Sequence, residues 1–444
     1  MPTKGTSVAL KAQAAASPPA ADKLLIIAAA FLDGVVCVSG VPMVVAQAAH
    51  VPFPSGVHLA AYQLCFMVPQ LITTLVAEQL TLHVSASALL FFTLMCTTVS
   101  TAIVALSLSQ RSLSLFFASN FLNGVFRHNK ILFGATASAL HMSTTDVRAA
   151  ARYGMMAGMV LSGIAGDAMQ NAVHVARLFI GVEALSAALV LARFLFGSRT
   201  VVVTARANQE YVQWLPCLTR APTVVYSAMA ALIAVILAAS VNQVMYPLAG
   251  PAYGLPYFFT GAQLCFHLVL QVILMPRVVE VAKRIVQQWK PNVLLAGNGE
   301  ERLTVIAALV MLVGCSVVPY AADHGPIVFY PASLVLVDLP GGVLTSLAAR
   351  AVEDAFGGVS GDAPKVTTLL DHMTLLVKMF AAPLRICTAA RFTGHKYPVR
   401  YISVPLMTYI LVRARTHNVA YAAAGMTATL LFLTSTVSSF EGEL

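Results

Sequence analysis

Charged side chains are scarce in this chain. Asp, Glu, Lys and Arg make up 10% of its 444 residues, whereas a soluble domain carries roughly 25%. Hydrophobic residues make up 58% and the mean hydropathy is +0.80. Apolar runs of about 20 residues, enough for a helix to span a bilayer, recur along the whole sequence. The composition excludes a soluble protein and predicts an all-α membrane protein with many spans.

The sequence also lacks a polar segment long enough to bury a core of its own. Its longest polar stretches are residues 1–23, 199–221, 277–302, 350–368 and 391–400. We therefore expect no independent aqueous enzyme domain. Residues 1–23 are rich in Ala, Ser and Pro and are expected to form a disordered cytoplasmic tail. They are not read as a cleavable signal peptide, because the first apolar run contains Asp33 and is long enough to span.

Cysteine pairs at metal-binding or redox spacing are missing too. The seven cysteines are scattered, mostly within apolar runs, and none forms a CxxC motif. They are interpreted as small buried hydrophobes, so we expect no structural disulfide, no metal site and no cofactor. The net charge of +9 would suggest nucleic acid as a partner of a soluble protein. Here Lys and Arg lie mainly between spans, where they orient helices, and nucleic-acid binding is not expected.

Twelve spans are expected, and the positive residues place the N-terminus in the cytoplasm. The predicted spans are residues 24–46, 57–77, 85–108, 113–137, 152–170, 175–197, 222–247, 255–275, 303–321, 326–348, 367–390 and 417–438. Up to the eleventh span, Lys and Arg concentrate in the inside loops and borders, whereas the outside ones hold only Arg111 and Arg177. The topology of residues 391–416 stays open. The apolar run 401–412 is either re-entrant or interfacial, or the last boundary is misplaced.

Residues 278–290 are expected to form a helix on the cytoplasmic headgroups. An apolar face of Val278, Val281, Ala282, Ile285 and Trp289 follows a 3.6-residue period, and basic and amide residues occupy the other face. A calmodulin-type target helix is the alternative.

The two halves of the chain share a short repeat. Gln63-Leu64-Cys65-Phe66 in the second span recurs as residues 263–266 in the eighth, and further glutamines follow at Gln70 and Gln271. Each preceding span contains polar residues and then a proline. Parallel six-span repeats of this kind are typical of one large class of transporters.

Three motifs resemble the major facilitator superfamily, most closely its branch of tetracycline-type drug/proton antiporters. Residues 31–34 (FLDG), together with Pro42, are similar to the first helix of that branch. Residues 123–128 (NGVFRH), together with the small residues that follow them, are similar to its fourth helix. The fifth span resembles the antiporter motif GxxxGPxxGG, with Ser162, Gly163 and Asp167 as departures. The loop at 75–83 keeps only Glu78 of the gating-loop pattern and lacks its glycine and arginines. Whether this degenerate loop still gates stays open.

The resemblance implies two pseudo-symmetric six-helix bundles, the major facilitator fold. The tail 1–23 would be followed by an N-terminal bundle at 24–197, a cytoplasmic linker at 198–221 and a C-terminal bundle at 222–444. Gly154, Gly158, Ser162, Gly163, Gly166 and Asp167 would form the helix-packing motif of the fifth span, either as packing alone or as a sliding contact between halves.

Ionisable residues inside spans cost roughly 2.5–3.5 kcal/mol each at mid-membrane, so they are functional candidates. Asp33 and Arg127 lie on helices that line the central cavity in this superfamily, where a carboxylate can exchange a proton. Their alternative role is to lock helices together as ion pairs. His267 as a metal ligand is disfavoured, because no second ligand lies one turn away. The expected substrate or coupling cavity comprises Asp33, Arg127, Gln63, Gln70, Asn242, Gln243, Gln263, His267, Gln271, Asp338, Asp371 and Lys378.

Three functions remain open. The first is a secondary active transporter that moves a small organic solute by alternating access and is coupled to protons. The second is a transporter-like receptor or scaffold that no longer transports, which the degenerate loop at 75–83 supports. The third is an intramembrane enzyme acting on lipid, but no His and carboxylate pair lies at one-turn spacing within a span. We expect a monomer embedded in lipid, in the plasma membrane or an organelle membrane. The sequence does not identify its substrate, transport direction or coupling ion.

Overall fold

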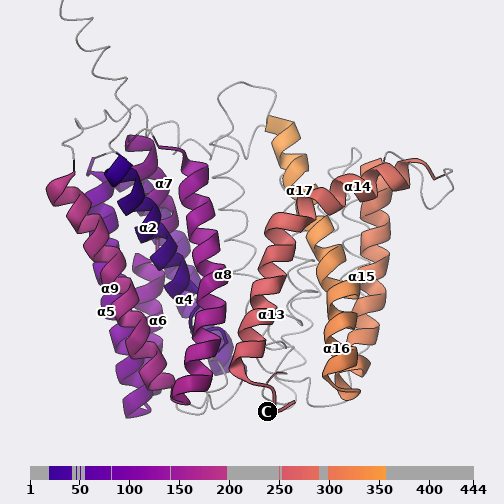
Figure 1. Cartoon of the computed structure of the whole chain (residues 1–444), viewed down its shortest axis with the longest axis horizontal. Coiled ribbons are helices and arrows are strands. Elements are labelled where there is room, and N and C mark those ends of the chain that lie inside the picture. Colours follow the sequence, from indigo (N-terminus) through magenta and orange to yellow (C-terminus); the bar gives the residue numbers. More distant parts are fainter. Residues whose placement is uncertain are drawn as a thin grey trace, which may run out of the picture.

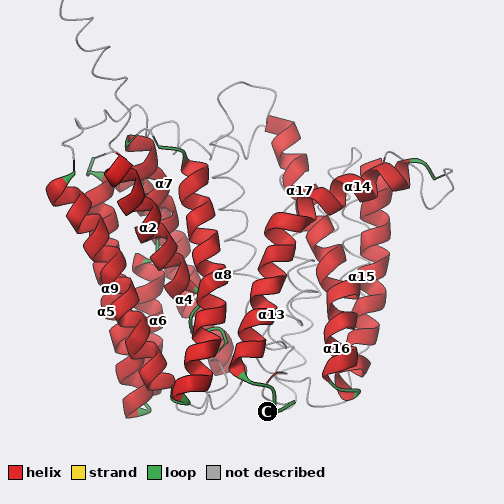
Figure 2. Ribbon diagram, viewed as in Figure 1, coloured by secondary structure: helices red, strands yellow, loops and turns green. Residues whose placement is uncertain are grey.

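The structure is a computed structural model and describes residues 20–42, 47, 51, 56–81, 83–140, 142–197, 250, 253–289 and 299–356. Every regular element among these residues is a helix, and no strand occurs in the same ranges (Figure 2). The expected seventh, eleventh and twelfth spans and residues 391–416 lie outside the described part. The domain boundaries proposed from the sequence therefore stay predictions.

The first group of helices extends to residue 196 (Figure 1). It comprises α2 (Ala20–Cys37), α4 (Gly56–Leu80), α5 (Ala86–Gln110), α6 (Leu113–Phe126), α7 (Asn129–Ala139), α8 (Thr144–Met169) and α9 (Ala172–Phe196). Helix α2 packs against both α8 and α9, and α5 packs against α6 and α9. Ile26 and Ala30 of α2 are fully buried against Leu90 and Leu94 of α5 and Val190 of α9.

The second group follows residue 256. It comprises α13 (Tyr257–Val269), the π-helical turn η1 (Leu270–Leu274), α14 (Met275–Gln287), α15 (Gly299–Asp323), α16 (Pro326–Ser333), the π-helical turn η2 (Leu334–Asp338) and α17 (Leu339–Phe356). Met275, Met311 and Leu344 are buried in the core that joins α14, α15 and α17. Helix α13 also packs along α8, which brings the two groups into contact.

Polar side chains and left-handed backbone define several helix ends. The side chain of Ser143 accepts a hydrogen bond from the backbone N–H of Asp146 at the start of α8, and Asn171 accepts one from Val173 at the start of α9. Arg111 after α5 and Gln170 after α8 adopt positive φ values of 54° and 49°. These ends agree with the predicted spans to within a few residues, except where α8 extends eight residues before its predicted start.

By length and hydropathy, four described helical segments could each cross a membrane: Ala86–Gln110, Ala172–Phe196, Tyr257–Gln287 and Pro326–Ala351. Other helices in the same part of the chain are interrupted or more polar. Helix α8, for example, carries Asp146, Arg148, Arg152 and Asp167.

One expectation was wrong. The fourth predicted span, residues 113–137, is not a continuous helix, because α6 ends at Phe126 and α7 begins at Asn129. Arg127 leaves the helical conformation, with φ −81° and ψ 64°. The cause is tertiary, since side chains of α4 and α2 bond to the residues at this break.

The predicted amphipathic helix is confirmed as α14. It turns away from the direction of α13 and crosses the end of the second group (Figure 1). The π-helical turn η1 and Pro276 lie where the direction changes. Both features interrupt the regular hydrogen-bond ladder of a helix and are common causes of a bend.

Candidate functional site

The break between α6 and α7 is hydrogen-bonded by α4. Gln70 Nε2 donates to the backbone oxygen of Arg127 at 3.0 Å. His128, which is 5% exposed, lies 2.6 Å through Nε2 from the oxygen of Val125 and 3.0 Å through Nδ1 from Thr74 Oγ1. Because a carbonyl oxygen only accepts, Nε2 carries the proton and Nδ1 accepts from the Thr74 hydroxyl. Broken helices with such satisfied backbone groups form solute and ion sites in membrane transporters.

The first residue of α7 bonds directly to Asp33. Asn129 Nδ2 donates to Asp33 Oδ1 at 2.6 Å, and the two residues are 1% and 8% exposed. Asp33 of α2 and the break between α6 and α7 therefore belong to the same buried site.

Arg127 and Glu183 are the other two ionisable residues of the buried site around Asp33. Arg127 lies close enough to Asp33 and Glu183 for its positive charge to attract both carboxylates. Glu183 of α9 is fully buried, and its Oε2 accepts from Thr101 Oγ1 at 2.6 Å. Arg127 Nη2 and Glu183 Oε1 are buried without a hydrogen-bond partner in the described part of the chain. We name Asp33, Thr101, Arg127, Asn129 and Glu183 the Asp33 cluster.

The second group contains another buried ionisable pair. His267 Nδ1 of α13 lies 3.3 Å from Asp338 Oδ2, and their side chains are 7% and 0% exposed. His267 precedes η1 by three residues, and Asp338 is the last residue of η2. π-Helical turns often occur at functional sites. Two uncharged residues share the His267 face of α13: Thr260 Oγ1 and Gln263 Oε1 are buried, with no hydrogen-bond partner among the described residues.

The small-residue motif of α8 packs against two different helices. A Cβ atom at Gly154 or Gly158 would overlap a backbone carbonyl of α2, at Phe31 or Val35. A Cβ at Gly163 would lie 2.6 Å from the oxygen of Tyr257, and one at Gly261 would overlap the oxygen of Met159. The two backbones can approach this closely only because both residues lack a side chain. Ser162 and Gly166 are also buried, and Ser162 Oγ donates to the oxygen of Met159 at 3.2 Å.

Asp167 joins the two groups of helices. Its Oδ1 and Oδ2 accept hydrogen bonds from the backbone N–H groups of Tyr257 and Phe258, each at 2.8 Å. These are the first two residues of α13, whose N-cap Pro256 has no side-chain capping bond. A carboxylate from α8 thus caps a helix of the other group.

The structure brings together only some of the predicted cavity residues. Asp33, Arg127 and Gln70 meet at the break between α6 and α7, and His267 meets Asp338. Gln271 lies in η1 and is half-buried. Gln263 lies on the same face of α13 as His267. The remaining cavity positions lie outside the described residues or side chains, as does Glu78 of the predicted gating loop: Gln63, Asn242, Gln243, Asp371 and Lys378. No group of three or more potential metal ligands occurs within the described ranges.

Sequence reasoning left Asn129, Thr101 and Glu183 off the predicted cavity. Glu183 is an ionisable residue inside the predicted span 175–197, but nothing in the sequence connects it to Asp33. The available signal for Asn129 was its position, since a consecutive Arg, His and Asn within an apolar span is unusual for a plain membrane helix.

No protein-family model matches the sequence, and no curated protein is significantly similar to it. Solved structures are similar in fold. The nucleoside transporter NupG aligns with a TM-score of 0.61 at 12% identity, covering 92% of this chain and 99% of its own. An auto-inhibited peptide transporter of the POT family aligns with a TM-score of 0.59 at 11% identity, covering 93% and 97%. The human organic anion transporter MFSD10 (TETRAN) aligns with a TM-score of 0.51 at 13% identity, covering 89% and 100%.

The alignments cover nearly the whole of each of these solved structures, and at this low sequence identity they show similarity of fold alone. Together with the apolar helices, they show that the chain is an integral membrane protein with the fold of these membrane transporters.

Proposed function

We propose that the chain is a secondary active transporter of the major facilitator superfamily. It moves a small organic solute by alternating access and couples this movement to protons. The fold supports the general class. Residues 31–34, 123–128 and 158–167 favour the tetracycline-type antiporter branch within it. The solved relatives carry nucleosides, peptides or organic anions, so the fold does not select a solute class.

The observation that carries proton coupling is the charge of the Asp33 cluster. Two carboxylates, Asp33 and Glu183, accompany one guanidinium, Arg127, at a broken helix. With all three ionised, one negative charge is uncompensated, at a cost of roughly 2.5–3.5 kcal/mol in a membrane interior. A proton bound by either carboxylate removes that charge. Asp33 is proposed as the coupling carboxylate and Arg127 as its charge partner.

Alternating access is supported by the contact between α8 and α13. Asp167 and the glycines at 163 and 261 hold the ends of these helices together at the end of the molecule expected to face outside. Opening to that side would separate them. The proposed cycle therefore breaks and re-forms this contact, while the opposite end opens and closes.

Transport by the full-length chain in proteoliposomes tests the proposal. Labelled uridine, a dipeptide, an organic anion and a cell metabolite extract would be offered with and without an imposed pH gradient. We expect at least one solute to accumulate only with the gradient, accompanied by proton flux reported by an internal pH dye. If no solute moves under either condition, the transport proposal is wrong.

The second candidate is a receptor or scaffold that has lost transport. It is favoured by the loop at 75–83, which lacks the glycine and arginines of the superfamily's gating pattern. Such a protein would bind a solute or partner but show neither uptake nor counterflow in the same vesicles.

A further inference from the structure

Helix α14 has two distinct apolar faces, whereas the sequence predicted one. Met275, Val279 and Val286 are buried against α15 and α17, and Ala282 is partly buried in the same core. Ala282 was assigned to the membrane face by periodicity, and the packing shows that it contributes to the core instead. One apolar face therefore fixes α14 to the bundle.

The second face remains exposed. Val278, Val281, Ile285 and Trp289 follow each other at three- or four-residue steps, and they are 37%, 57%, 50% and 49% exposed. This spacing places Val278, Val281 and Ile285 along one side of α14, next to the buried face, and Trp289 follows two residues after the last helical residue. We name these four residues the exposed stripe. Packing of the bundle does not account for it, because the buried face already supplies that contact.

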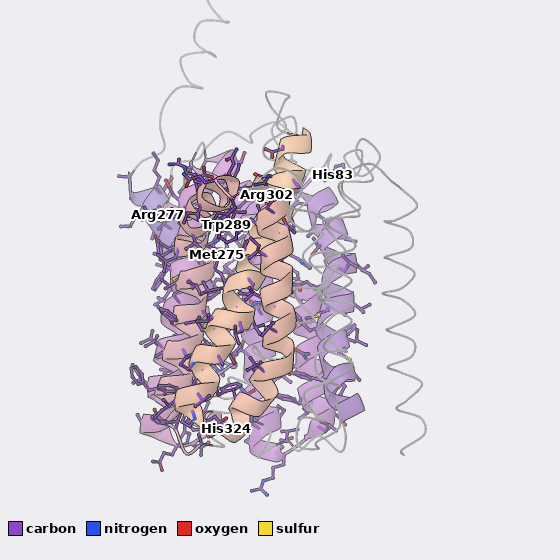
Figure 3. All side chains as sticks on the ribbon, turned by 90° about the vertical axis from the view of Figure 1, so that its right-hand side faces the viewer. His83, Met275, Arg277, Trp289, Arg302 and His324 are labelled. Carbon is purple, nitrogen blue, oxygen red and sulfur yellow. The ribbon has the colours of Figure 1, made fainter. Side chains whose placement is uncertain are left out.

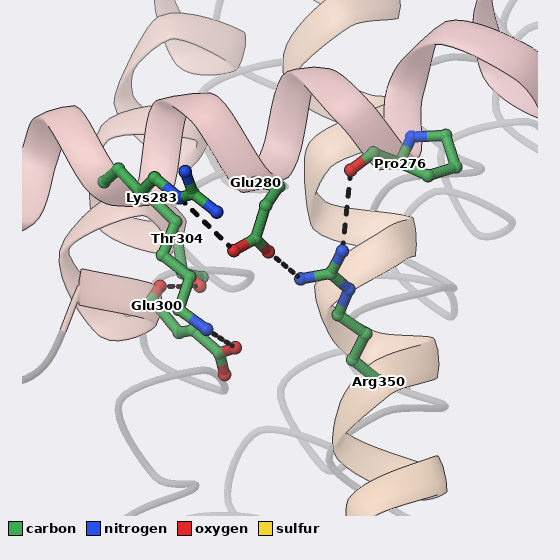
Figure 4. Close-up of polar contacts among 7 residues, drawn as sticks. Pro276, Glu280, Lys283, Glu300, Thr304 and Arg350 are labelled. Atoms are coloured by element: carbon green, nitrogen blue, oxygen red, sulfur yellow. Dashed lines mark hydrogen bonds and ion pairs between the residues drawn. The ribbon is translucent and has the colours of Figure 1, made fainter.

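Ion pairs neutralise a third sector of the helix. Lys283 Nζ lies 2.9 Å from Glu300 Oε1 of α15, and Arg350 Nη1 of α17 lies 3.1 Å from Glu280 Oε2 (Figure 4). Arg350 also donates to the backbone oxygen of Pro276 at 3.5 Å. The hydrogen bond from Arg350 is the main cause that lowers the pKa of Glu280, with contributions from nearby cations. These contacts attach α14 to the ends of both neighbouring helices.

Positive charge remains beside the exposed stripe. Arg277 and Arg284 are seven residues apart, and so lie on the same side of the helix, adjacent to Val281. Both are exposed. Among the described residues, the ion pair of Arg284 is with Glu280 at 3.7 Å, a carboxylate already shared with Arg350. Arg302 Nη1 donates to the backbone oxygen of Trp289 at 2.7 Å, so a further cation lies at the end of the stripe. Arg277, Trp289 and Arg302 occupy the same end of the molecule, and His324 lies at the opposite end (Figure 3).

We propose that α14 is a binding surface for anionic phospholipid. The exposed stripe enters the boundary between headgroups and acyl chains, and Arg277 and Arg284 bind the headgroup phosphates. The helix begins where α13 and η1 end and turns across the end of the second group. Because a membrane-spanning segment is expected to meet the headgroups there, the stripe would lie at the depth of the lipid boundary. A protein that wraps around a target helix is disfavoured, because the buried face and the ion pairs hold α14 against the bundle. The proposal does not depend on transport.

Lipid selectivity of the full-length protein tests the surface. The protein would be reconstituted in nanodiscs of equimolar phosphatidylcholine and phosphatidylglycerol, and the lipids retained after extraction would be counted by mass spectrometry. The variant carrying Arg277→Gln and Arg284→Gln is expected to lose preference for phosphatidylglycerol by about thirtyfold, or about fivefold for each cation. The matched control carries Arg111→Gln and Arg177→Gln, which remove two exposed arginines at the opposite end.

The control variant is expected to keep the preference of the wild type. If it loses as much as the α14 variant, the effect reflects overall charge and the proposal is wrong. An unchanged preference in the α14 variant would also overturn it.

Trp289 gives a second, independent measurement. In a Trp214→Phe background it is the remaining tryptophan, and brominated phosphatidylcholine should quench its fluorescence. Val281→Ser with Ile285→Ser is expected to reduce this quenching. No quenching in the parent background would contradict the proposal. Protection of Trp289 by calcium-loaded calmodulin, without lipid quenching, would assign the stripe to a protein partner instead.

Discussion

Replacing Asp167 by alanine should favour separation of α8 from α13. The substitution removes both 2.8 Å hydrogen bonds that cap the first two N–H groups of α13. When α8 and α13 are in contact, those N–H groups then have only water as a hydrogen-bond partner. When the helices are separated, the substitution removes no hydrogen bond, because Asp167 does not reach α13 in that state. The variant should therefore populate the separated state more than the wild type does.

The magnitude follows from the two bonds and from their exposure. A hydrogen bond to a charged group contributes about 1.5–3 kcal/mol in net terms. Because Asp167 is half-buried, water screens its charge, and we reduce the sum of the two bonds to about 1.5–3 kcal/mol in total. At 1.4 kcal/mol for each factor of ten, the equilibrium shifts roughly ten- to hundredfold toward separation.

Spin labels on exposed positions at the joined ends of α8 and α13 would report the distance distribution by double electron–electron resonance. The matched control is Asp146→Ala, which removes an exposed carboxylate from the first turn of the same helix at its other end. The reasoning is refuted if Asp167→Ala leaves the distribution unchanged, or if Asp146→Ala shifts it equally. Asp167→Asn should have an intermediate effect, because its amide offers one acceptor and no charge.

Three further predictions concern packing and charge. Gly261→Val forces a side chain against the backbone oxygen of Met159 and should destabilise the fold by at least the 1–3 kcal/mol typical of overpacking. Its Tm should therefore be lower than that of the control Gly181→Val, because no atom lies near the added side chain at Gly181. Asp338→Ala removes the carboxylate beside the buried His267 ring and should cost about 1–3 kcal/mol, the usual penalty for a buried polar group that loses a partner. A thermal stability equal to wild type would contradict a structural contribution of the pair. Glu280 has a folded pKa below its ordinary 4.5, so its ion pair stabilises α14 above that pH and is lost as the pH falls through the lowered value. The protection factors of the α14 amides, which correct the hydrogen-exchange rates for their intrinsic pH dependence, should therefore be constant from neutral to mildly acidic pH and fall only below 4.5, whereas Arg350→Gln should lower them at neutral pH and remove this pH-dependent change.

Local patterns predicted the elements of the fold well. The apolar runs gave helix positions, and the 3.6-residue period of residues 278–290 identified α14 before its packing was known. The small residues of the fifth span identified a close helix contact, because glycine spacing on a helix is a local property. The periodicity could not separate the buried face of α14 from the exposed stripe, since both are apolar and adjacent.

Contacts between distant residues could not be read in this way. The break at Arg127 depends on Gln70, which is 57 residues away, and Asn129 meets Asp33 across 96 residues. Asp167 was placed in a packing motif at a position where the family pattern has glycine. Its capping of α13, 90 residues later, depends on how the two groups of helices meet. His267 and Asp338 were both candidates, but their pairing and the two π-helical turns beside them are tertiary features.

Proton-driven accumulation by Asp33→Asn tests the central claim most directly. The solute found by the uptake screen would be measured in proteoliposomes in two modes: accumulation driven by an imposed pH gradient, and exchange without one. If Asp33 carries the coupling proton, Asp33→Asn abolishes accumulation and retains exchange and protein abundance. The account is contradicted if Asp33→Asn accumulates solute like the wild type. It is equally contradicted if the variant is merely unstable and Arg127→Gln restores both its stability and its pH-driven accumulation.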